Sequence, residues 1–218
     1  MTRNEGRRGQ GAPRFAAGAD GWIGGLTHAP SPNCDARPAG MEIDLLVIHN
    51  ISLPPGRFGG SYIPDLFANR LDCDAHPYFD QLRGLRVSAH FLVRRDGAAI
   101  QFVSCAQRAW HAGVSSFGGR ERCNDFSIGI ELEGTDFEPF APVQYRTLAR
   151  LTAALRQAYP LADVVGHEHI APGRKTDPGP FFDWTRYQSL ALAALRRQPG
   201  AAGIGSSPSG IRMGFALA

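Results

Sequence analysis

The residues best suited to catalysis gather in one short stretch, between residues 166 and 180. Among turn-forming prolines and glycines it holds two imidazoles, an ammonium group and a carboxylate, from His167, His169, Lys175 and Asp177. Zinc takes histidine nitrogens and carboxylate oxygens as ligands, and a catalytic zinc keeps three protein ligands and one open position. The stretch therefore indicates part of a metal site, with a further ligand supplied from elsewhere in the chain.

His49 is the candidate for that further ligand. It follows a short, nearly continuous apolar run at 43–48, which is typical of a buried strand. Functional side chains often gather where strands end and loops begin. A histidine in this position, far upstream of the 166–180 stretch, suggests a metallohydrolase.

The sequence leaves two ligand combinations open downstream. If a strand continued through this region, His167 and His169 would share a face and could both bind the metal, with Asp177 in a supporting role. Alternatively, the turn at Pro172-Gly173 would fold the chain back and place Asp177 beside His167.

Two glutamates are candidates for proton transfer. Glu131 and Glu133 share one face of a predicted strand at 126–133, whose isoleucines indicate a buried central position. A carboxylate beside a metal can accept a proton from water and deliver it to a leaving amine. Lys175 could stabilise a developing oxyanion at the same place.

Strands and helices alternate in the elements that must position these residues. Apolar runs and turn signals predict strands at 43–49, 88–95, 99–104, 126–133 and 164–165. Helices are predicted near 63–69, at 142–158 and at 184–196. The second and third strands should form a hairpin across Arg95-Asp96-Gly97. This order predicts a single-domain α/β fold, with a central mixed β-sheet flanked by α-helices.

Length and composition limit the number of domains, the partners and the location that we expect. The 218 residues suit one domain, and we expect a disordered tail at 1–20, a folded catalytic body at 21–197 and a flexible tail at 198–218. The net charge of +3 owes much to arginines in the first tail, and the body shows no basic stripe, which argues against nucleic-acid binding. No segment resembles a signal peptide or a membrane span, so we expect no membrane association and a cytoplasmic protein. The four cysteines form no C-x-x-C pair and are expected to be free thiols.

Six collinear segments within residues 21–190 resemble the zinc-dependent N-acetylmuramoyl-L-alanine amidase family. The segments are 30–32, 47–56, 86–90, 108–113, 121–136 and 170–184. The likeness is closest to the cytosolic branch (AmpD type), the 1,6-anhydro-N-acetylmuramyl-L-alanine amidases of cell-wall recycling. The family's fold, a mixed sheet flanked by helices, agrees with the pattern of predicted elements.

The resemblance implies a role for each candidate in the site. The positions of His49, His167 and Asp177 match the family's ligands for one zinc ion, Glu131 matches its catalytic glutamate, and Lys175 matches the lysine that assists the transition state. The implied reaction is hydrolysis of the amide between the lactyl group of (1,6-anhydro-)N-acetylmuramic acid and L-alanine. Relatives often carry an acidic residue at the position of His169.

Substrate contacts are expected from four further residues in the matching segments. Arg86 and Arg122 could hold the carboxylates of the peptide stem, Trp110 could stack on the sugar, and Asn50 could contact the substrate backbone. The long insertion at 52–86 is expected to wall or gate the cleft.

The expected partner is a small anhydromuropeptide, and the expected state is a monomer. Three other histidines are expected to be structural or to support the ligands: His76, His90 and His111. Two alternatives remain: a periplasmic amidase acting on intact peptidoglycan, and a module that binds peptidoglycan fragments without cutting them.

Overall fold

Two long parallel strands form the centre of the structure, a computed structural model that describes residues 15–197 and 212–213. These strands are β5 (Leu45–Ile51) and β11 (Ser127–Glu133), which pair along their whole length. The seven-stranded sheet has the order β13-β12-β5-β11-β6-β7-β3. Its other strands are β3 (Thr27–His28), β6 (Phe91–Val93), β7 (Ala99–Gln101), β12 (Asp163–Gly166) and β13 (Arg212–Met213). Strand β7 runs antiparallel to β6 while the other pairs are parallel, which confirms the mixed sheet predicted from the sequence.

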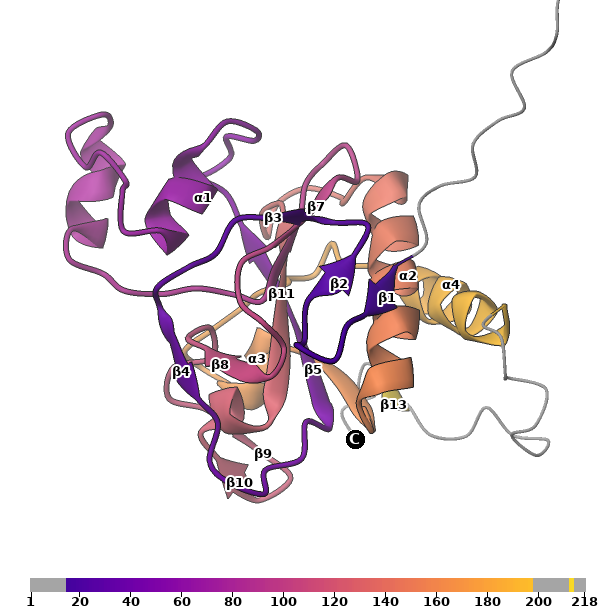
Figure 1. Cartoon of the computed structure of the whole chain (residues 1–218). Helices are drawn as coiled ribbons and strands as arrows, with labels where there is room; N and C mark the ends of the chain where they lie inside the picture. The colour runs from indigo at the N-terminus through magenta and orange to yellow at the C-terminus, as the bar shows by residue number, and fades with distance from the viewer. Residues whose placement is uncertain (1–14, 198–211, 214–218) are drawn as a thin grey trace, which may run out of the picture.

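The two faces of the sheet carry different kinds of side chain, because alternate side chains of a strand point to opposite faces. On β11, Ile128, Ile130 and Leu132 pack into the largest hydrophobic cluster, together with residues of α2 (Pro142–Ala158) and α4 (Trp184–Arg196). Both helices therefore cover this face, as Figure 1 shows. The opposite face carries the polar side chains of β5 and β11 that the sequence singled out.

Both long helices have the bounds predicted from the sequence. Helix α2 has a proline at its first position, where the missing N–H costs nothing. The carboxylate of Asp183 caps α4 by accepting a hydrogen bond from the Arg186 N–H at 2.8 Å.

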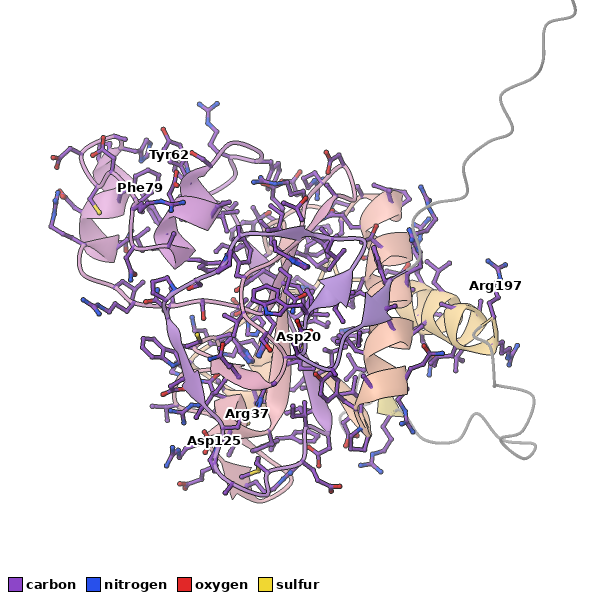
Figure 2. All side chains as sticks on the ribbon, viewed as in Figure 1. Asp20, Arg37, Tyr62, Phe79, Asp125 and Arg197 are labelled. Carbon is purple, nitrogen blue, oxygen red and sulfur yellow. The ribbon has the colours of Figure 1, made fainter. Side chains whose placement is uncertain are left out.

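The insertion at 52–86 forms a lobe beside the sheet, on the side away from α2 and α4 (Figure 1). It contains α1 (Tyr62–Phe67) and the 3₁₀ helix η1 (Pro77–Leu82). The lobe shares a second hydrophobic cluster with residues of the sheet, and Phe67 and Phe79 are buried in it. Figure 2 shows Tyr62 next to Phe79, and their rings meet edge to face with centroids 4.9 Å apart.

Short antiparallel pairs, which the sequence did not predict, surround the sheet. They are β1 (Ala16–Ala17) with β2 (Ile23–Gly24), β4 (Cys34–Ala36) with β8 (Gln107–Ala109), and β9 (Ser116–Phe117) with β10 (Arg120–Glu121). The 3₁₀ helix η2 (Cys123–Asp125) leads into β11.

The folded body begins before the expected boundary at residue 21. Phe15 is buried against the main cluster and Ala16–Ala17 forms β1, because an apolar residue outside the predicted body finds a long-range partner. Of the predicted C-terminal tail, residues 212–213 pair with β12. The rest of both predicted tails lies outside the described residues.

All four cysteines are free thiols, as predicted, and two of them are buried. Among the helices in the described ranges, none combines the length and the hydropathy of a membrane-spanning segment.

Candidate metal centre and active site

Three side chains converge at the carboxyl ends of the central strands. His49 lies near the end of β5, His167 directly follows β12, and Asp177 lies on the loop beyond it. Nδ1 of His49 lies 3.0 Å from Nδ1 of His167 and 3.0 Å from Oδ2 of Asp177, and the remaining edge of the triangle is 3.1 Å. These three residues form a group that could hold a metal ion.

The far side of each imidazole also has a partner. Nε2 of His167 lies 3.0 Å from the carbonyl oxygen of Ala112, and Nε2 of His49 lies 2.9 Å from Nδ1 of His111. A carbonyl oxygen can only accept, so the neutral His167 ring carries its proton on Nε2 and presents a lone pair on Nδ1. Partners of this kind orient the histidines of metal sites.

The protonation states suit a cation. Burial is the main reason that the pKa of His49 is lowered to about 4, so its ring is neutral at pH 7. Burial raises the pKa of Asp177, but hydrogen bonds with His167 and His49 outweigh it and bring that pKa below its usual value. Two imidazoles and one carboxylate are a donor set that can bind a divalent metal.

Glu131 stands next to this group. It is paired in register with His49 on the neighbouring strand, so both side chains lie on the same face of the sheet. Within the described residues, its Oε2 is the one buried side-chain polar atom without a hydrogen-bond partner. Burial, and then the charge of Asp177, raises the pKa of the Glu131 carboxyl well above its usual value. Such an orphaned group in a cleft is typical of a functional carboxylate.

Glu133, the other candidate for proton transfer, has its carboxylate bound by neighbouring protein groups. Its carboxylate accepts hydrogen bonds from the backbone N–H of Gly59 at 2.6 Å and from that of Arg95 at 3.1 Å. It also pairs with Arg94 at 3.3 Å. These contacts tie the beginning of the 52–86 lobe to β11.

His169 is not brought to the group. The predicted strand does not continue past Gly166; residues His167–Ile170 form the short helix α3 instead, so the two histidines do not share a face. Nδ1 of His169 accepts a hydrogen bond from the Gly166 N–H at 2.8 Å, which caps this helix. Its ring packs against Trp184. Of the two combinations left open by the sequence, the geometry favours His167 with Asp177.

The convergent side chains open into a cavity of about 870 Å³. Its lining includes Glu131, the exposed Lys175 and the partly exposed Trp110. The Trp110 indole N–H donates to Asp35 at 3.2 Å, which fixes the ring in the wall. Apolar residues of the 52–86 lobe form another wall, in agreement with the walling role expected of this insertion: Leu53, Leu66, Phe67, Tyr78, Leu82 and Leu85.

Asn50 lines the cavity, but its amide is already bonded to the protein. Its Nδ2 donates to Asp136 at 2.6 Å and to the carbonyl oxygen of Pro178 at 3.1 Å. Asp136 also accepts a hydrogen bond from the Thr176 hydroxyl. The structure thus gives Asn50 a part in holding the loop of Asp177 in place.

Asp136 was not identified from the sequence. It follows the end of β11 by three residues, and an acidic residue just past a central strand is the signal that could have identified it. Its partners come from segments far away in the chain, and no spacing rule connects them.

Arg86 and Arg122 do not line the main cavity. Both are exposed; Arg86 borders a smaller hollow of about 170 Å³, and Arg122 pairs with Asp125 at 3.2 Å. Their predicted contact with substrate carboxylates stays a prediction.

Known proteins are similar to this chain in sequence and in fold. The family model for N-acetylmuramoyl-L-alanine amidase matches residues 39–180. The 1,6-anhydro-N-acetylmuramyl-L-alanine amidase AmpD of Citrobacter freundii is 54% identical over 181 residues, which cover 82% of this chain and 97% of that protein.

Solved structures of amidases have a fold similar to that of this chain. The crystal structure of a selenomethionine AmpD derivative superposes with a TM-score of 0.77 at 57% identity, covering 78% of this chain and 97% of that one. The amidase AmiD of Escherichia coli, solved in complex with the substrate anhydro-N-acetylmuramic acid-L-Ala-D-gamma-Glu-L-Lys, superposes with a TM-score of 0.50 at 30% identity, covering 71% of this chain and 60% of that one. With a family model that matches well over half of its length and relatives of this identity, the chain belongs to the N-acetylmuramoyl-L-alanine amidase family.

Proposed function

We propose that this amidase hydrolyses the amide bond between the lactyl group of 1,6-anhydro-N-acetylmuramic acid and L-alanine in small muropeptides, with one zinc ion held by His49, His167 and Asp177. The observation that carries the proposal is the convergence of three ligand atoms, 3.0–3.1 Å apart, beside the unpartnered carboxylate oxygen of Glu131. The match covers 97% of the length of a relative named 1,6-anhydro-N-acetylmuramyl-L-alanine amidase, and that name supports the choice of substrate.

The donor set fits zinc. Ligand atoms at about 2.0 Å from a tetrahedral zinc lie roughly 3.3 Å apart, close to the edges of the observed triangle. Two histidines and a carboxylate leave one position of four open, as in catalytic zinc sites. When bound, zinc supplies Lewis-acid polarisation of a carbonyl and a lower pKa for a coordinated water.

Glu131 is the group that moves the proton in this proposal. Its buried carboxylate accepts a proton from the attacking water and passes it to the amine of L-alanine as the amide bond breaks. The raised pKa suits this task, because burial makes the Glu131 carboxylate a stronger base than an exposed glutamate. Lys175 lines the same cavity, which supports its assignment to stabilising the oxyanion.

Residues inside and outside the cavity are assigned to the two ends of the substrate. Trp110 presents an indole fixed by Asp35 on which a sugar ring can stack. We assign Arg86 and Arg122 to the far end of the peptide stem, where exposed guanidinium groups can bind carboxylates. Small muropeptides are the proposed substrate in the cytoplasm, with the protein acting as a monomer.

The test compares two substrates with zinc-loaded protein. Purified 1,6-anhydromuropeptide and intact sacculi are digested in parallel, and the released peptides are identified by mass spectrometry. We expect anhydro-N-acetylmuramic acid and a free peptide starting with L-alanine from the small substrate, and little release from sacculi. Release from sacculi without turnover of the small fragment would overturn the substrate, and no cleavage of either would overturn the activity.

A further inference from the structure

His111 is a partly buried imidazole in the wall of the cavity, and the proposed mechanism does not use it. It lies between two side chains: its Nδ1 is 2.9 Å from Nε2 of His49, and its Nε2 is 3.2 Å from the hydroxyl of Ser127. The His49 and His111 rings meet edge to face, with centroids 5.0 Å apart. This places a second imidazole directly behind one of the three convergent side chains.

Strand β11 is shaped to receive the His111 ring. A Cβ atom built on Gly129 would lie only 2.5–2.7 Å from three atoms of that ring, which real structures do not tolerate. Gly129 is therefore the residue that lets the imidazole lie against the strand and reach His49. The backbone there needs no left-handed conformation, so close approach is what requires a glycine at this position.

The backbone of the same segment is held in place by Asn124. Its side-chain oxygen accepts hydrogen bonds from the N–H groups of His111 and Ala112, at 3.2 and 2.8 Å. The carbonyl oxygen of Ala112 in turn lies 3.0 Å from Nε2 of His167. Two adjacent residues thus contact the far nitrogens of both histidines in the convergent group.

The two contacts differ in what they determine. The Ala112 carbonyl can only accept, and so it fixes the proton of His167 on Nε2. His111 can accept through Nδ1 only when its own proton lies on Nε2, where the Ser127 hydroxyl, which can donate or accept, is 3.2 Å away. A histidine that binds a metal through Nδ1 has its proton on Nε2 and needs an acceptor for it.

We propose that His111 is a positioning residue for His49: in the metal-loaded protein its Nδ1 accepts the Nε2–H of His49, holding that ring in the tautomer and orientation that direct Nδ1 to the cation. Ser127 offers an acceptor for the Nε2–H of His111, Gly129 gives the ring room, and Asn124 holds its backbone. This inference rests on the metal site of the proposed function.

The test measures zinc affinity directly, by competition with a chelator of known strength. His111→Phe keeps a ring over Gly129 but has no acceptor, and we expect its zinc dissociation constant to rise about 10- to 100-fold. His111→Asn returns an acceptor near the position of Nδ1 and should show a smaller loss. His28→Ala, an exposed histidine on the short edge strand β3, is the control and should bind zinc as the unaltered protein does.

A second measurement does not depend on how well the variants fold. In the zinc-loaded, unaltered protein, long-range ¹H–¹⁵N spectra should show His111 with a bare Nδ1 and a protonated Nε2. A proton on Nδ1 of His111, or unchanged zinc affinity in His111→Phe, would overturn the inference while leaving the proposed function intact. If the unaltered protein bound no zinc at all, the proposed metal site would fail first.

Discussion

At the scale of single residues, two carboxylates on one face of β11 have opposite surroundings. Glu133 is surrounded by donors from Gly59, Arg94 and Arg95, whereas Oε2 of Glu131 is buried without a partner. A buried carboxylate that is left unpaired lowers stability and is retained where it has a function. The contrast separates two residues that the sequence pattern treats alike.

We therefore expect Glu131→Gln to lose catalysis and keep the fold. The amide cannot accept a proton, so kcat should fall by about 10²- to 10⁴-fold. Zinc content, measured by metal analysis, should stay at one equivalent, and the melting temperature should not fall, because the substitution removes a buried, unpaired charge.

Glu133→Gln is the matched control on the same strand face. We expect it to lower the free energy of unfolding, since Arg94 loses its charged partner, with the catalytic step of the folded fraction retained. The opposite pattern, near-normal turnover in Glu131→Gln and loss of chemistry in Glu133→Gln, would show that the proton is handled by the other carboxylate.

His169 gives a prediction about stability alone. It caps α3 through the Gly166 N–H, so His169→Ala should lower the free energy of unfolding by about 1 kcal/mol, measured by chemical denaturation. His169→Gln should restore most of that loss, because glutamine at this helix position can accept the same hydrogen bond. A fall in zinc content in His169→Ala would contradict this interpretation and point to a ligand role.

At the scale of secondary-structure elements, local signals predicted what is locally determined. Helices α2 and α4 have the predicted bounds, because their apolar spacing and end residues lie within the segments themselves. Of the two alternatives for the chain after 164–165, the strand does not continue beyond Gly166, since the His169 side chain caps a helix turn. The short strands β3, β4 and β13 depend on partners far along the chain, which no local pattern encodes.

The connection between β7 and β11 carries His111 and depends on one buried cation. The Arg37 guanidinium donates to the carbonyl oxygens of Asn124, Asp125 and Ser127 at 2.8–3.0 Å, and to that of Cys105 at 3.2 Å. Figure 2 shows Arg37 beside Asp125. Burial lowers the pKa of Arg37 to about 10, which leaves it charged at neutral pH.

Replacing Arg37 should destabilise the protein strongly. Arg37→Met leaves several buried carbonyl oxygens without a donor, at a cost of about 3 kcal/mol or more in the free energy of unfolding. Arg37→Lys should recover only part of this, because one ammonium group cannot reach acceptors arranged around a planar guanidinium. Denaturant titration measures both. Arg146→Met, on the exposed side of α2, is the control and should change stability by less than about 0.5 kcal/mol. An equal loss of stability in this control would show that the effect of Arg37→Met does not come from its hydrogen bonds.

At the scale of the whole molecule, the 52–86 lobe bears on how substrate enters. Its buried phenylalanines share a cluster with residues of the sheet, and Glu133 fixes its beginning through Gly59. We expect a fixed wall: in hydrogen exchange, the amides of α1 should be protected to a similar degree with and without product peptide. Fast exchange in the free protein that slows on binding would show a gate instead.

The residues of the candidate site could be predicted only where the residue type itself indicates a chemical role. Residue type and position made His49, His167, Asp177 and Glu131 candidates, and the family resemblance selected them over His169 and Glu133. Their supports could not be selected in this way: the Ala112 carbonyl belongs to the backbone, and Gly129 matters only because a ring from another segment lies against it.

The metal should also stabilise the whole fold. The proposed ligands come from parts of the chain 118 and 128 positions apart, so an ion joining them ties β5 to the segment after β12. A ligand that binds only the folded state stabilises it by about 2.7 kcal/mol when its free concentration is 100 times Kd. The melting temperature of the chelated protein should therefore rise by several degrees as zinc is added, at about 2–4 °C per kcal/mol for a fold of this size. Glu131→Gln should show the same rise and Asp177→Ala should show none; a rise that persists in Asp177→Ala would mean that zinc binds elsewhere.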